Sequence, residues 1–96
     1  MTDENKLIRD SGRGDHARRL LTDELLIEAF EALEKTYIEA MIDTGVAQRD
    51  SYARDRLHQA VHCTRKVRDH LETVLRNGEL AKAELNDIAG TRVRAA

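Results

Sequence analysis

The sequence predicts an all-α protein: an antiparallel hairpin of two helices, at about 22–45 and 50–77, plus a short third helix at about 79–89. The chain contains no proline. Apolar residues recur at spacings of three and four along both long segments, which is the period of a helix that buries one face. The connection at 45–50 is short, so the two helices are expected to be antiparallel neighbours.

The first helix is predicted from a regular apolar face. Thr22 is the expected N-cap, and Gly45 the expected C-terminal stop. The face consists of Leu26, Phe30, Leu33, Tyr37 and either Ala40 or Met41. Ile27 and Ile38 fall on the flank of this face, so the apolar arc is wider than one partner helix needs. A third helix or another subunit is expected to cover the excess.

Glu34 lies inside the apolar arc and therefore needs a basic partner. The second helix supplies one, and aligning the helices about their loop predicts that Glu34 pairs with Arg65. The same alignment predicts that Arg68 pairs with Asp23 or Glu24. The charges favour this arrangement, because residues 23–45 are mainly acidic and residues 46–78 mainly basic.

The second helix has its own apolar face, and Asn77-Gly78 is expected to end it. The face consists of Leu57, Ala60, Val61, Thr64, Val67, Leu71, Val74 and Leu75. The third helix follows and is expected to end at Gly90. Residues 1–20 show no sustained period and include the turn-like segment 11–14. The expected organisation is a mobile tail at 1–20, one helical domain at 21–90 and a C-terminal tail at 91–96.

Composition narrows the functional classes. The chain has 96 residues, a net charge of −2 and one cysteine, and no apolar run long enough for a membrane span. We therefore expect a cytoplasmic protein that does not associate with membranes. A core with only three aromatic residues is thin, and oligomerisation is the usual remedy in so small a scaffold.

Few residues are arranged for chemistry. His58 and His62 share a helix face, as helical zinc ligands do, but their angles place them towards solvent and no third ligand is evident. Cys63 is expected to be a structural cysteine, on the flank of the helix or partly buried, and not a nucleophile, because His62 points about 100° away from it. No nucleophile motif and no phosphate-binding loop is present. The sequence therefore predicts a non-enzymatic protein without metal or cofactor.

Basic residues leave a second functional class open. The second helix and the C-terminal tail could contact phosphates as a small nucleic-acid-binding regulator does. The candidates for such contacts are Arg65, Lys66, Arg68, Arg92 and Arg94.

Two patterns carry a resemblance to a known group of proteins. They are "EAF..LE..YI.A" in the first helix and "RKVR.HLE....NG.LA...L" in the second and third, within residues 28–85. In these patterns the chain resembles small helical proteins of the packaging and structural modules of tailed phages, prophages and gene transfer agents, such as small terminases. The resemblance implies a helical hairpin that oligomerises, contact with DNA, and a larger packaging or capsid protein as partner. It also implies a location in the host cytoplasm or the virion. The chain departs from the small-terminase pattern because it has no N-terminal helix-turn-helix.

The first hypothesis is therefore a structural or assembly protein that forms a homo-oligomer. Its interface is expected on the flank of the first helix and on the third helix. The expected interface residues are Ile27, Phe30, Glu34, Ile38, Met41, Leu80, Leu85 and Ile88.

Overall fold

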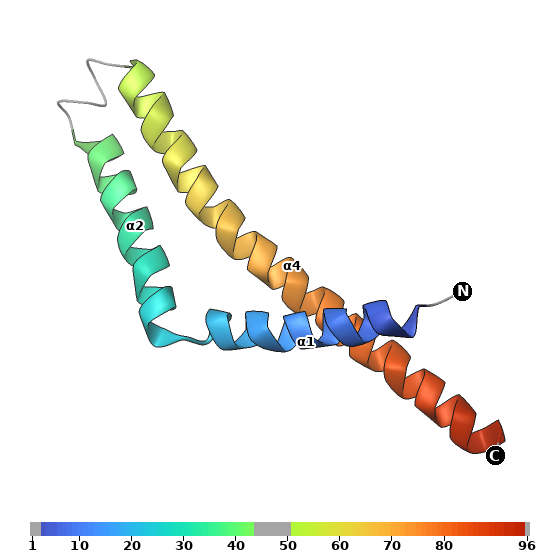
Figure 1. Ribbon diagram of the computed structural model, residues 1–96. Helices are drawn as coiled ribbons and strands as arrows, with labels where there is room; N and C mark the ends of the chain where they lie inside the picture. Colours follow the sequence, from blue (N-terminus) through green and yellow to red (C-terminus); the bar gives the residue numbers. More distant parts are fainter. Residues whose placement is uncertain (1–2, 44–50, 96) are drawn as a thin grey trace. The chain divides into compact units, whose positions relative to one another are not determined.

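The computed structural model describes residues 3–43 and 51–95, with side chains up to residue 93. Three helices are assigned there: α1 (Glu4–Leu21), α2 (Glu24–Ile42) and α4 (Ser51–Ala95) (Figure 1). Within these described ranges all assigned elements are helices, which confirms the all-α class. The chain forms two compact units: unit 1 joins residues 1–21 to 71–96, and unit 2 spans residues 22–70.

Helix α1 occupies the segment that was expected to be a tail. Asp3 accepts a hydrogen bond from the backbone N–H of Asn5 at 3.0 Å, which caps the start of the helix. Glu4 lies in the first turn, and Arg18 and Arg19 lie in the last, so the charges suit the helix dipole. The predicted turn at 11–14 was wrong, because these residues lie inside α1.

Helix α4 continues through both predicted stops. Residues 51–95 form one helix, so the predicted break at Asn77-Gly78 and the predicted end at Gly90 were wrong. The second and third helices of the sequence prediction are parts of this one helix. No glycine in the described ranges has a positive φ angle, so neither Gly78 nor Gly90 takes the left-handed conformation that ends many helices.

Unit 2 pairs α2 with the first part of α4, residues 51–70. The cap of α2 is Asp23, not the predicted Thr22: its side chain accepts a hydrogen bond from the N–H of Leu26 at 2.9 Å. At the other end, the N–H of Asp43 donates to the carbonyl of Glu39 at 2.9 Å. The predicted stop at Gly45 and the predicted connection at 45–50 lie outside the described residues.

Unit 1 is a crossing of α1 with the second part of α4. The two helices meet at Gly14 and Gly78: a Cβ built on Gly14 would lie 2.6 Å from the Cα of Gly78. Leu7, Ala17 and Ala81 are the buried hydrophobic residues around this crossing. Small residues at the crossing let the backbones approach closely, so glycine here is an interface residue and not a turn signal.

Ion pairs hold the rest of the α1–α4 contact in unit 1. Arg18 donates to Glu79 at 2.7 Å. Lys82 pairs with Asp15, and Arg92 pairs with Glu4. The hydrogen bond from Lys82 lowers the pKa of Asp15 below its usual value. These pairs are largely exposed, so they orient α1 more than they stabilise it.

Candidate interaction surfaces

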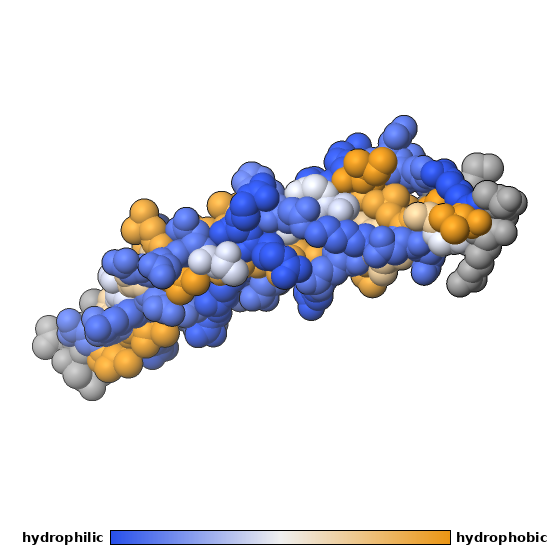
Figure 2. Space-filling model, turned by 90° about the horizontal axis from the view of Figure 1, so that it is seen from below, coloured by the Kyte–Doolittle hydropathy of each residue, from blue (hydrophilic) through white to orange (hydrophobic). Residues whose placement is uncertain are grey.

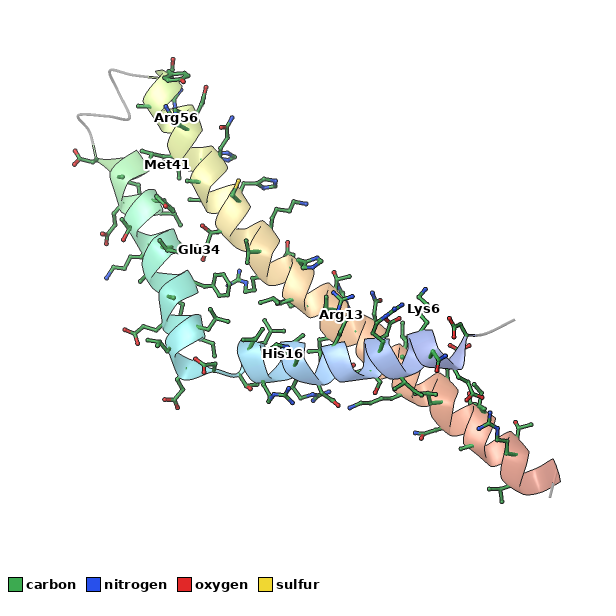
Figure 3. The ribbon with its side chains drawn as sticks, viewed as in Figure 1. Lys6, Arg13, His16, Glu34, Met41 and Arg56 are labelled. Atoms are coloured by element: carbon green, nitrogen blue, oxygen red, sulfur yellow. The ribbon has the colours of Figure 1, made fainter. Side chains whose placement is uncertain are left out.

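The polar centre of unit 2 is the carboxylate of Glu34. Its side chain is only 20% exposed and accepts a hydrogen bond from the Arg65 guanidinium at 2.5 Å, while the guanidinium of Arg68 lies 3.9 Å away (Figure 3). The predicted pair of Glu34 and Arg65 is thus confirmed. The predicted pairing of Arg68 with Asp23 or Glu24 was wrong, because Arg68 shares Glu34.

The surroundings of Glu34 favour the charged form of its carboxylate. The hydrogen bond from Arg65 lowers the pKa of Glu34 below its usual value, and partial burial offsets only part of this effect. The positive charges of Arg65 and Arg68 lower the pKa further. A single carboxylate thereby holds two bases of α4 and sets the register of the α2–α4 pair.

Replacing Glu34 with glutamine is expected to destabilise unit 2 and to reduce its acid sensitivity. A carboxyl group whose pKa is lowered by folding stabilises the fold at neutral pH, and that contribution is lost as the pH falls through the lowered pKa. Urea midpoints measured from about pH 5 down to pH 2 should therefore fall less in Glu34→Gln than in the unmodified chain. Glu39→Gln is the matched control, because the side chain of Glu39 is exposed and pairs with Lys35 of the same helix at 4.0 Å. Equal acid sensitivity of Glu34→Gln and the unmodified chain would contradict this role.

The apolar residues of helix α2 are incompletely covered within unit 2. No residue of α2 is buried, although the helix is rich in leucine and isoleucine. Four of its large hydrophobic side chains are exposed: Leu25 (73%), Ile27 (40%), Leu33 (45%) and Ile42 (71%). Hydrophobic residues also reach the surface in the view of Figure 2. Exposed apolar residues that gather on one helix indicate a place where another chain packs.

One face of α2 is free of charged residues. It consists of Leu25, Ala29, Ala32, Leu33, Thr36 and Ala40. At about 100° per residue these six positions fall within roughly 100° of arc. All are exposed except Ala40, which is half-buried. We call this face the leucine–alanine strip. The acidic residues of α2 lie outside it, so it offers a partner helix an uncharged and closely approachable surface.

The predicted interface residues fall into two groups. Ile27 and Leu80 are exposed, at 40% and 69%. The other six are half-covered within their own units: Phe30, Glu34, Ile38, Met41, Leu85 and Ile88. Figure 3 shows Glu34 and Met41 on the side of α2 that faces α4. The sequence argument had assigned the excess apolar arc to the Ile27 and Ile38 flank. It had placed Leu33 on the main apolar face, which was wrong, because Leu33 is 45% exposed and belongs to the leucine–alanine strip.

The predicted nucleic-acid residues are mostly engaged with acids. Arg65 and Arg68 share Glu34, and Arg92 pairs with Glu4. Lys66 is exposed. The side chain of Arg94 lies outside the described residues.

The histidine pair and the cysteine lie on the surface of α4. His58 and His62 are exposed, as their helical angles predicted. In the described part of the chain, no three metal-binding side chains cluster there or elsewhere. Cys63 is exposed, which agrees with the flank position and not with the partly buried one.

Unit 1 contains a groove between α1 and α4 with a volume of about 500 Å³. One wall comes from α1 and the other from α4, and each wall contributes residues at i, i+3, i+4 and i+7. The lining residues are Asp3, Lys6, Leu7 and Asp10, together with Asn77, Leu80, Ala81 and Glu84. The floor is apolar and three of the four charged residues are acidic. Sequence reasoning missed this groove because it treated residues 1–20 as a tail.

None of the helices in ranges 3–43 and 51–95 combines the length and the apolar character that crossing a bilayer requires. Comparison with protein-family models, curated proteins and solved structures gives no match to this chain.

Proposed function

We propose that this protein is a non-enzymatic assembly module that associates with itself through α2. The observation that carries the proposal is the exposure of α2: the helix has no buried residue and shows four large hydrophobic side chains to solvent. A second copy of α2 is the occupant that the surface favours. The leucine–alanine strip has no charge to repel its copy, and its alanines allow two helices to approach closely.

The contact between copies is expected to be isologous, with the same strip on both sides. Leu25 and Leu33 would then pack against the alanines of the second copy, as large and small residues alternate in well-packed helix interfaces. Burial of these two leucines would remove from water the side chains that the chain itself leaves 73% and 45% exposed.

The direct test is the mass of the full chain in solution as a function of concentration. Sedimentation equilibrium is expected to show a monomer–dimer or larger equilibrium in the micromolar range. A chain that stays monomeric at the highest attainable concentration would contradict the proposal. A role in a phage packaging or structural module, with a larger packaging or capsid protein as partner, is a narrower form of this proposal. It is supported by the sequence resemblance at residues 28–85.

The alternative of a small nucleic-acid-binding regulator has weaker support. Arg65 and Arg68 already form ion pairs with Glu34. This alternative would be supported if the unmodified chain retarded duplex DNA in a salt-dependent way and an Arg65→Glu, Lys66→Glu variant did not.

A further inference from the structure

We propose that the groove of unit 1 receives the first part of α4 from a second copy of the chain. This proposal rests on self-association, the proposed function, but it uses a different surface from α2. It would give the protein a second contact between copies, with unlike surfaces on the two sides.

The groove has the form of a helix-binding site. Its two walls each follow the spacing i, i+3, i+4 and i+7, which is the spacing that one helix presents to another. Leu7 and Ala81 are buried at its floor, with exposures of 8% and 3%, while Leu80 remains 69% exposed. An exposed leucine beside a buried apolar floor indicates that a further apolar side chain is missing from the contact.

The charges of the groove select the kind of helix that fits. Asp3, Asp10 and Glu84 line it against the single base Lys6. A helix with apolar residues and bases on one face has a charge complementary to this lining, whereas an acidic helix would be repelled.

The first part of α4 carries such a face. It contains Tyr52, Arg56, Cys63 and Val67, at spacings of 4, 7 and 4, and all four side chains are exposed. Tyr52 and Val67 are 68% and 55% exposed. The guanidinium of Arg56 lies 5.6 Å from the centre of the Tyr52 ring. The exposed polar residues Gln59 and His70 fall in the same arc, and Lys66 adds a second exposed base about 40° from Tyr52. We call this face the basic strip.

The other exposed apolar helix face in unit 2 is the leucine–alanine strip of α2. It is uncharged, so it carries no base to complement the acids of the groove. Of the exposed faces on α2 and the first part of α4, the basic strip is the one with complementary charge. A contact between unlike surfaces can repeat from copy to copy, so it would build assemblies larger than a dimer.

A charge-exchange experiment tests the contact. The groove variant is Asp10→Lys with Glu84→Lys, and the strip variant is Arg56→Glu with Lys66→Glu. Each variant alone is expected to lose assemblies larger than a dimer, with the association weakened by more than roughly tenfold. An equimolar mixture of the two variants should recover the contact, because the reversed charges again complement each other. Sedimentation velocity of the full chains gives the readout.

Two further variants keep the result interpretable. Glu84→Lys alone avoids the half-buried Asp10, so it tests the groove if the double variant loses helicity by circular dichroism. Glu72→Lys is the matched control, because Glu72 is an exposed acid on α4 that does not line the groove.

The outcomes separate this proposal from the proposed function. Unchanged assembly in both charge variants, or no recovery in the mixture of folded variants, would overturn the groove contact. If the charge variants lose assembly and variants of the leucine–alanine strip keep it, the groove contact is supported and the role of α2 is overturned. A strictly monomeric unmodified chain would overturn both.

Discussion

Replacing Gly78 with leucine is expected to release α1 from α4. A Cβ at position 78 would lie 2.5 Å from the Cα of Gly14 and 2.9 Å from the backbone oxygen of Asp10. These neighbours are backbone atoms of α1, so they cannot rotate away as a side chain would, and the helices must separate. Overpacking of this kind costs about 1–3 kcal/mol.

The helix-forming gain of the substitution works in the opposite direction. Glycine inside a helix is less favourable than a good helix former by about 0.5–1 kcal/mol. The steric cost at Gly78 exceeds this gain because the whole α1–α4 contact depends on the close approach. Once released, α1 should lose helicity, since an isolated helix of 18 residues with glycines at 12 and 14 is marginal.

Amide hydrogen exchange over residues 4–21 is the decisive measurement, supported by urea unfolding. Gly90→Leu is the matched control, because it lies in the same helix and a Cβ there meets nothing within 4 Å. Gly12→Ala serves the same purpose in α1. Both controls should be neutral or stabilising. Retained protection of α1 in Gly78→Leu would show that the crossing does not depend on this glycine.

Replacing Leu25 and Leu33 with glutamine is expected to convert the self-associated chain to monomers. Burying a leucine side chain is worth about 1.5–3 kcal/mol, and a symmetric contact contains each leucine twice. Loss of two to four such contributions shifts a dissociation constant by at least roughly a hundredfold. Both side chains are exposed within one chain, so the fold of the monomer should keep its helicity.

Sedimentation equilibrium over the same concentration range reads out this change, and circular dichroism verifies the fold. The matched control is Glu28→Gln with Glu39→Gln, two exposed positions of α2 outside the leucine–alanine strip. The control should associate as the unmodified chain does. Equal association of the leucine variant would remove α2 from the interface.

Glu34 shows how far sequence reasoning reaches in this protein. Its position inside an apolar arc, beside a basic second helix in the sequence, was enough to predict its pairing with Arg65. The partner of Arg68 could not be predicted in the same way. A carboxylate can accept from two guanidinium groups, and only the positions of the side chains decide whether Arg68 reaches Glu34 or Asp23.

Gly14 and Gly78 show where the same reasoning fails. Local sequence rules assign both to turns, because glycine favours helix ends and loops. The close contact between two segments more than sixty positions apart makes each a helix-crossing residue. A signal for α1 was present, since Leu7, Gly14 and Leu21 are spaced by seven, but glycine does not count as apolar in a search for hydrophobic periodicity.

The amino-acid sequence by itself determined the helical class, most residues of the apolar faces that pair α2 with α4 and the pairing of Glu34 with Arg65, because these follow from periodicity and charge. Leu33 and Val67 were predicted on those faces wrongly, because both are exposed. The tertiary structure alone decided that α1 exists, that α4 continues through Gly78, and that a groove forms between them. The physical reason is that glycine has no side chain, so neither hydrophobicity nor charge in the sequence indicates its role. Whether it ends a helix or admits a neighbouring backbone depends on what lies opposite it in space.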